Sequence, residues 1–350
     1  MGNQFDVVGF GEAMIRFSPM HHLRLEQAAE LRLAIAAAEL NVAVNVSHLG
    51  LKSKWVSKMV DTWSGHFVIN HGRAHGVDMS DVHLVPFDGR GKVRNGLCFV
   101  EIGVGPRPNR QIYDRAHSAI NTIEEGELDW KKILSNTKWL HNSGITTALS
   151  DVCVREVITS MKTAKELGVR NSIDLNYRST LWTPEAAQAV IKEVMPYVDV
   201  IIGNEEDFEK MLGIMTEEPD GEYSKLNPES YRKVAEEVSD RYPNVQVVGT
   251  TLRNAKTGLL NDWQTVMLYE GEFYTSRKYE DLEIVDRTGG GDSFASAIIY
   301  SMITGQDPQY AIDLAGAYSA LCHGYFGDWN WATKEEAERV MQGGTARVIR

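Results

Sequence analysis

Two patterns of apolar and polar positions follow one another along the second half of the chain. Short apolar runs closed by glycine or polar residues are typical of buried strands, and longer stretches with apolar residues at helical spacing are typical of amphipathic helices. Strands that alternate with such helices predict a parallel sheet covered on both faces. The polar stretch 217–228, with two prolines, is expected to be a surface loop. The pattern predicts strands at 138–144, 172–176, 198–204 and 245–251, and helices at 152–168, 184–197 and 205–213.

The first half of the chain has similar elements, interrupted by a different pattern. A strand is predicted at 5–11 and a helix at 37–50. Residues 93–113 favour extended, partly exposed strands without a helix between them. We therefore expect one α/β domain over residues 1–350, with a small β-sheet lid formed by two inserted segments, about 12–36 and 94–116.

Charge and cysteine content exclude several classes of function. The 350 residues carry a formal net charge of −12, whereas nucleic-acid and anionic-membrane surfaces need clusters of Lys and Arg. We therefore expect no nucleic-acid and no membrane partner. Cys98, Cys153 and Cys322 lie too far apart for a disulfide framework or a thiolate zinc site. Because no secretory leader and no long apolar run is recognisable, we expect a cytoplasmic protein.

The segment 284–302, IVDRTGGGDSFASAIIYSM, carries the clearest chemistry. A strand is predicted to end at Val285, three glycines follow, and a helix is predicted to begin near Asp292. Glycines leave backbone N–H groups unobstructed, and a helix start adds unpaired donors, so the loop suits an anion. Asp292 could then accept a proton from an attacking hydroxyl. The pattern alone fits equally well a glycine turn in which Asp292 only stabilises the helix start.

Residues 286–294, DRTGGGDSF, resemble the signature D-T-x-G-A-G-D-x-F of the ribokinase (PfkB) family of carbohydrate kinases. The resemblance implies a ribokinase-like three-layer α/β/α sandwich with a mostly parallel central sheet and a small lid. It also implies transfer of the γ-phosphoryl group of ATP to a sugar hydroxyl. Gly289, Gly290 and Gly291 would form the anion hole for the transferring group, and Asp292 would be the base. Phosphoryl transfer depends mainly on positioning and electrostatic stabilisation, which such a loop provides.

Further segments resemble this family in the expected order. Those at 113–119, 174–182, 250–253 and 327–330 are similar to 2-keto-3-deoxygluconate kinases in particular. No G-x-x-x-x-G-K-[ST] motif occurs, which argues against a P-loop kinase. The matching segments are AAAELNVA (36–43), YDR with SA (113–115, 118–119), DLNYR with LW (174–178, 181–182), NEED (204–207), TTLR (250–253) and GDWN (327–330).

The resemblance implies a role for each matching position. Mg²⁺ would be held mostly through water near Asn204 and Glu205. A monovalent cation is a further expected cofactor. We also expect a dimer formed through the lids. The sugar would contact Ala37, Glu39, Asn41, Tyr113, Arg115, Arg178 and Asp292, and ATP would contact Asn176, Asn204, Thr250, Arg253, Gly289 and Gly291.

Arg115 and Arg178, with Tyr113, favour an acidic sugar, because a guanidinium can meet both oxygens of a carboxylate. The expected reaction is phosphorylation of 2-keto-3-deoxygluconate to its 6-phosphate. Singly, each arginine is equally well explained as a solvated residue at a strand end. The alternatives are a kinase for fructose or 5-keto-2-deoxygluconate, and a sugar or nucleotide sensor without catalysis.

Three departures from the family pattern bear on the predicted function. Alanines stand at 36 and 37 where relatives have a glycine pair, which puts the substrate in question. Asp207 replaces the usual Glu of N-x-x-E, and Ala297 stands where relatives often have Gly. Asn41 and Asn204 also have structural explanations, as a packed helix residue and a helix-start residue.

Overall fold

The computed structural model describes residues 4–215 and 227–344. Most of the loop predicted at 217–228 therefore lies outside the described residues. No helix within these two ranges is long and apolar enough to cross a membrane.

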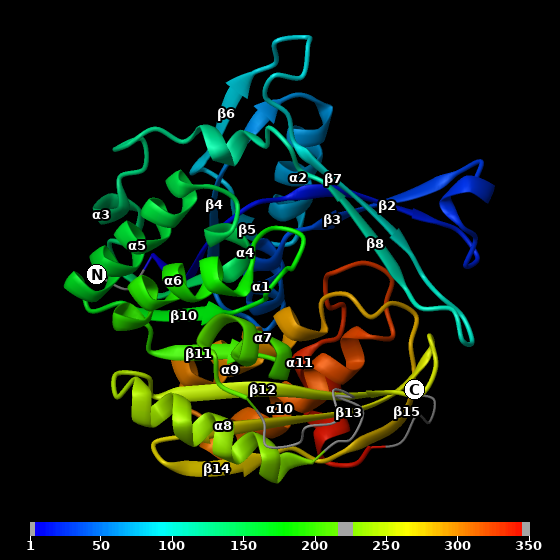
Figure 1. Cartoon of the computed structure of the whole chain (residues 1–350), viewed down its shortest axis with the longest axis vertical. Helices are drawn as coiled ribbons and strands as arrows, with labels where there is room; N and C mark the ends of the chain where they lie inside the picture. The colour runs from blue at the N-terminus through cyan, green and yellow to red at the C-terminus, as the bar shows by residue number, and fades with distance from the viewer. Residues whose placement is uncertain (1–3, 216–226, 345–350) are drawn as a thin grey trace.

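Within the described ranges the main sheet has eleven strands, and most of their pairings are parallel. Figure 1 shows its arrangement. Strand β1 (Phe5–Phe10) is central and pairs in parallel with β4 (Ser53–Asp61) and β9 (Thr137–Ser143). Parallel pairing continues through β10, β11 and β12, and β13, β14 and β15 add antiparallel strands at one edge. The remaining strands are β5 (Val77–Asp78), β6 (Val82–Pro86), β10 (Arg170–Asp174), β11 (Val200–Gly203), β12 (Val247–Ala255), β13 (Leu260–Tyr269), β14 (Glu272–Thr275) and β15 (Tyr279–Glu283).

Helices cover both faces of this sheet, which confirms the predicted α/β/α sandwich. Neighbouring strand residues point to opposite faces: Val7 packs into the core under α1, α9 and α10, whereas Val8 packs into the core under α5, α6 and α8. Both side chains are fully buried. The helices are α1 (Ala38–His48), α2 (Trp63–Ala74), α3 (Trp130–Ile133), α4 (Gly144–Thr147), α5 (Asp151–Glu166), α6 (Pro184–Val194), α7 (Glu205–Leu212), α8 (Pro228–Arg241), α9 (Gly290–Thr304), α10 (Pro308–Cys322) and α11 (Lys334–Met341), with short 3₁₀ turns at Leu25–Gln27, Ala119–Thr122 and Met195–Tyr197.

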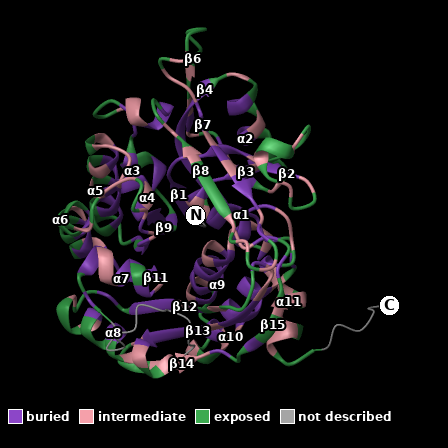
Figure 2. Ribbon diagram, turned by 45° about the vertical axis from the view of Figure 1, so that its right-hand side comes forward, coloured by how far each residue is buried: buried purple, intermediate pink, exposed green. Residues whose placement is uncertain are grey.

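A separate four-stranded sheet, called here the small sheet, projects to one side of the main body (Figure 1). It consists of β3 (Leu31–Ala36), β2 (Met14–Pro19), β7 (Gly96–Glu101) and β8 (Arg110–Asp114), in that spatial order. Its edge strand β8 is largely exposed, as the green colour in Figure 2 shows. The small sheet thus draws its strands from both of the segments in which the sequence places the lid.

One predicted boundary is wrong. The strand expected to end at Val285 is β15, which ends at Glu283 and runs antiparallel to β13. After Ile284 the chain leaves the sheet, and the Val285 N–H donates to the carbonyl of His323 at the end of α10. The sequence suggested a longer strand because Ile284 is apolar and buried, although it lies outside the strand pairing of β15 and β13.

Candidate active site

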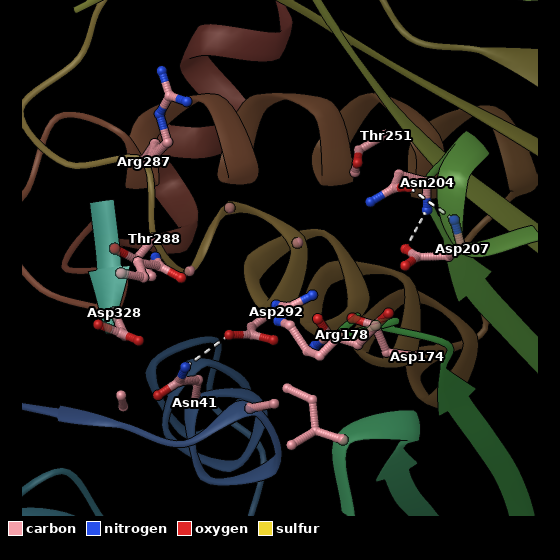
Figure 3. A pocket seen from close by; sticks show the side chains of 18 of the residues that line it. Asn41, Asp174, Arg178, Asn204, Asp207, Thr251, Arg287, Thr288, Asp292 and Asp328 are labelled. Carbon is pink, nitrogen blue, oxygen red and sulfur yellow. Dashed lines mark hydrogen bonds between the residues drawn. The ribbon is translucent and has the colours of Figure 1, made fainter. Parts of the chain in front are cut away.

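A cavity of about 570 Å³ opens at the carboxyl ends of the parallel strands (Figure 3). Its wall includes Asp174 at the end of β10, Gly203 at the end of β11, and the loop that leads into α9. Side chains of the small sheet, among them Met14 and Tyr113, line the opposite wall. Ligands in open α/β sheets bind at this edge, so the cavity is the candidate site.

The glycine loop places free backbone donors at the cavity. Gly289 has φ +82°, and a Cβ there would lie 2.0 Å from the Asp328 carbonyl oxygen, so both the conformation and the space require glycine. Helix α9 begins at Gly290, and no side chain caps its start. The first N–H groups of a helix have no partner within the helix. All three glycines line the cavity, which fits the predicted anion hole.

Asp292 lies in the first turn of α9 and faces the middle of the cavity, between Asn41 and Arg178 (Figure 3). The Asn41 side chain donates to its Oδ2 at 2.7 Å. Burial raises the pKa of Asp292 to about 7, the nearby charges of Asp328 and Glu39 add to this, and the Asn41 hydrogen bond opposes it. A carboxyl group with a pKa near neutrality is suited to act as a general base.

Arg115 and Tyr113 meet at the small-sheet side of the cavity, and Arg178 reaches them from the main sheet. The Arg115 guanidinium stacks on the Tyr113 ring at 4.7 Å, and Arg178 lines the same cavity. Glu12 is the carboxylate next to Arg115, at 3.4 Å. The buried Nε and Nη1 of Arg115 nevertheless have no hydrogen-bond partner among the described residues. The structure therefore brings together the three residues that the sequence linked to an acidic sugar.

Glu39 and Ala37 lie at the start of α1 and also line the cavity. Glu39 Oε1 accepts from the backbone and the hydroxyl of Ser143, at 3.1 and 2.8 Å, and from the Thr146 hydroxyl at 2.5 Å. Glu39 is thus fixed in place. Ala37 has φ −164°, an extended conformation open to any residue, so alanine causes no strain there. The methyl groups of residues 36 and 37 only narrow the cavity.

The opposite end of the cavity contains most of the residues predicted to bind ATP. Asn204 caps α7: its Oδ1 accepts from the Asp207 N–H at 3.0 Å, and Asp207 accepts from the Asn204 and Tyr177 N–H groups. Asp207 therefore fixes the backbone around the start of α7, and it also lines the cavity. Asn176, Glu205 and Arg253 line the cavity.

Thr250 does not line the cavity. Its side chain is buried in the sheet, and the neighbouring Thr251 faces the cavity together with Arg253. Successive residues of a strand point to opposite sides, so only one of the two threonines can share a face with Arg253. The motif TTLR located the strand correctly but selected the wrong threonine.

Glu205 is almost fully buried, and burial raises its pKa. In the described residues, no three His, Cys, Asp or Glu side chains lie close enough together to hold a metal ion. A metal held mainly by phosphate oxygens and water, with Asn204 and Glu205 nearby, fits this donor set, because Mg²⁺ retains several waters.

Sequence reasoning missed several residues of the cavity and its surroundings. Arg16 on β2 is completely buried and binds Asp286 and Asp328, and Asp328 lines the cavity. Arg16 stands within the apolar strand segment MIRF, and a charge in a buried strand needs a partner of opposite charge. This position could therefore have predicted a buried ion pair. Arg287 also lines the cavity, and it stands where the family signature has threonine.

Comparison with known proteins gives consistent results. Residues 4–333 match the pfkB family of carbohydrate kinases. A 2-dehydro-3-deoxygalactonokinase of Haloferax volcanii is 34% identical over 99% of both chains, and a 2-dehydro-3-deoxygluconokinase of Thermoproteus tenax is 28% identical over 96% of this chain and 94% of its own. The crystal structure of a 2-dehydro-3-deoxygluconokinase of Thermotoga maritima is 40% identical, with a TM-score of 0.91 over 97% of this chain and 100% of its own.

Proposed function

Because the chain belongs to the pfkB family of carbohydrate kinases, we propose that it transfers the γ-phosphoryl group of ATP to the 6-hydroxyl of 2-keto-3-deoxygluconate. That the protein is a sugar kinase follows from the family and from its kinase relatives. The observation that supports the acidic substrate is Arg115, which lines the cavity and whose buried Nε and Nη1 have no hydrogen-bond partner among the described residues, with Glu12 Oε2 3.4 Å from Nη1. In this proposal the sugar carboxylate accepts from Arg115.

The sugar carboxylate lies between Arg115 and Arg178, next to Tyr113. Charge-assisted hydrogen bonds to a carboxylate are among the stronger polar interactions in proteins, and they fix orientation as well as affinity. A neutral hexose offers no anion to these groups. Glu39, Asn41 and Ala37 form the other wall, where hydroxyl groups of the sugar meet polar side chains that are already held in place.

In the reaction, Asp292 accepts the proton of the attacking hydroxyl. The hydroxyl oxygen forms a bond to the γ-phosphorus, and the bond between that phosphorus and the β,γ-bridging oxygen breaks, so that ADP leaves with the electron pair. The N–H groups at the start of α9 stabilise the negative charge on the transferring phosphoryl group. Asp292 then releases its proton to solvent.

ATP lies along the end of the cavity formed by Asn176, Asn204, Thr251, Arg253 and the glycine loop. Mg²⁺ neutralises part of the phosphate charge, and Asn204 and Glu205 would hold it, mainly through water. Whether a monovalent cation is required is tested by replacing potassium with tetramethylammonium in the assay.

The small sheet acts as a lid over the sugar in this proposal, so that closure excludes water from the reaction. It also provides a dimer interface. Its edge strands β3 and β8 expose Leu31, Leu33 and Ile112, with 39, 43 and 36% of their surface accessible. Exposed edge strands with apolar side chains favour pairing with a second copy. Light scattering of the intact chain tests the dimer.

The test is ATP turnover with Mg²⁺ on 2-keto-3-deoxygluconate, its galacto epimer, 5-keto-2-deoxygluconate, fructose and ribose. We expect the highest kcat/KM for a 2-keto-3-deoxy acid. The epimer belongs in the panel because one relative is named for it (2-dehydro and 2-keto describe the same carbonyl group). A preference for a neutral sugar would contradict the role of Arg115, and absence of turnover with all five would favour a sensor.

A further inference from the structure

Arg16 makes a buried junction between the small sheet and the loop that leads into α9. Its guanidinium forms ion pairs with Asp286 and with Asp328, the latter at 2.6 Å, and donates to the Thr288 hydroxyl at 2.8 Å. Neither Arg16 nor Asp286 is exposed to solvent at all. The partners are about 270 and 312 positions away in the sequence, so these contacts exist only in the folded chain.

The first arm of the junction fixes the glycine loop. Asp286 Oδ1 accepts from the backbone and the hydroxyl of Thr288, at 3.1 and 2.5 Å, and Oδ2 accepts from the Gly327 N–H at 3.2 Å. Thr288 directly precedes Gly289, the first glycine of the predicted anion hole. The orientation of the loop thus depends on a carboxylate that is itself held by Arg16.

The second arm leads to the base. The chain runs from Asp328 directly into Trp329, which contacts Asn41, and Asn41 donates to Asp292 at 2.7 Å. Trp329 Nε1 donates to Asn41 Oδ1 at 2.9 Å, so the amide orientation is fixed. The Asp328 carbonyl oxygen also packs against Gly289. A displacement of Asp328 would therefore reach the anion hole and the base together.

Stability alone is a weak reason for this junction. Burying one guanidinium and two carboxylates has a large desolvation cost, and apolar groups of similar volume often stabilise a core equally well. The junction also leaves one carboxylate in excess of its cation. What the charged groups provide is direction: Ser18, Thr288, Asp286 and Asp328 accept hydrogen bonds at fixed positions around one planar guanidinium.

We infer that Arg16 is a positioning residue for phosphoryl transfer: from β2 of the small sheet it holds the anion-hole loop through Asp286 and the base through Asp328 and Asn41. This inference rests on the proposed function, because it assigns Arg16 to the reaction at Asp292. Arg16 does not line the cavity, so it acts through these neighbours and not by touching the sugar.

The test compares Arg16→Met and Arg16→Lys with a matched control, Arg32→Met. Arg32 lies on the adjacent strand β3, is exposed, and stacks at 3.7 Å on Phe326, two residues before Asp328. It forms no ion pair with Asp286 or Asp328. We expect kcat of Arg16→Met to fall about 10²-fold, because small misplacements of reacting groups have effects of this size. Arg16→Lys keeps the positive charge but loses the planar set of guanidinium donors, and we expect kcat to fall about tenfold. The KM for the sugar should change less than about threefold in both.

A purely structural role predicts a different result. It would lower the melting temperature, while kcat measured at a temperature where circular dichroism shows a folded protein would stay near that of Arg32→Met. That result for both Arg16 variants would overturn the inference. If Arg16→Met does not fold, Arg16→Lys decides by the same criterion.

Asp328→Asn tests the second arm by a signal that does not need turnover. The charged groups that face Asp292 are Glu39 on α1, Asp328 after α10, Asp174 at the end of β10 and Arg178 after β10. Removing the Asp328 charge should lower the pKa of Asp292, measured by carbon-13 titration and assigned by the signal lost in Asp292→Asn. An unchanged titration would contradict the link through Asp328. If the wild type turns over no sugar, the proposed function fails, while this titration still tests the link.

Discussion

The two sides of the cavity are built in different ways. On the phosphate side, the groups proposed to act on the transferring phosphoryl group are backbone N–H groups and one carboxylate, all within residues 286–292 and fixed by a buried network. On the sugar side, the groups are long charged side chains that come from several distant segments. Among the described residues, Nε and Nη1 of Arg115 have no hydrogen-bond partner. The phosphate side is therefore suited to a common reaction, and the sugar side can change its substrate by changing a few side chains.

The largest expected effect isolates the phosphate side. Asp292→Asn keeps the shape of the side chain and the Asn41 contact surface but removes the proton acceptor. We expect kcat to fall by about 10²–10⁴-fold, with the KM for the sugar little changed. Steady-state kinetics on the best sugar of the panel measures both. Turnover close to that of the wild type would contradict the assignment of the base.

The second prediction isolates the sugar side. Arg115→Ala removes the guanidinium and leaves Glu12 without its neighbouring cation. We expect kcat/KM for the keto-deoxy acid to fall by about 10²-fold, because a buried charge-assisted contact is lost, while any slow turnover of fructose stays the same. Arg110→Ala, an exposed arginine at the start of the same strand β8, is the matched control. An equal loss for the acidic and the neutral sugar would contradict carboxylate recognition.

The third prediction concerns pH and separates the two sides again. Asp292 accepts a proton only as a carboxylate, and its pKa in the free protein is raised to about 7. We therefore expect kcat/KM to fall about tenfold per pH unit below that value and to be constant above it. The guanidinium groups of Arg115 and Arg178 take no part in this proton transfer. Residual activity of Asp292→Asn should lack the inflection, and a profile that is flat from pH 5 to 8 would contradict the prediction.

The same contrast explains what the sequence could predict. The glycine loop, Asp292 and the alternating elements are local patterns, because strand and helix periodicity and a glycine turn depend on residues close in the chain. Arg115 and Arg178 could be linked only through a resemblance, since nothing in their local sequence indicates that they meet. Thr250 was selected in place of Thr251 because a strand pattern gives the position of a strand but not which of its faces lines a cavity.

Long-range ion pairs were the main omission. Arg16 stands within a strand that otherwise looks like an ordinary buried one, and its partners lie near the end of the chain. Asp207 is a second example: the sequence indicates its place in the N-x-x-E-like motif, and the fold adds that its carboxylate completes the cap of α7. In both cases the sequence contained the residue type, and only tertiary structure shows which hydrogen bonds it makes.

The smallest predicted effect is one of stability, and it concerns Asp292 without any substrate. An unfolded Asp has a pKa near 3.8, and folding raises that of Asp292 to about 7. Its stabilising contribution is therefore complete below the unfolded value and is lost as the pH rises through the folded value. Asparagine has no charge to bury. Asp292→Asn should match the wild type near pH 4 and be more stable above pH 7, by about 1–2 kcal/mol once screening by water in the cavity is allowed for. Urea unfolding of the two proteins at pH 4.5, 6 and 8 measures the difference in their free energies of unfolding. A difference that does not grow with pH would contradict the raised pKa of Asp292 in the folded protein.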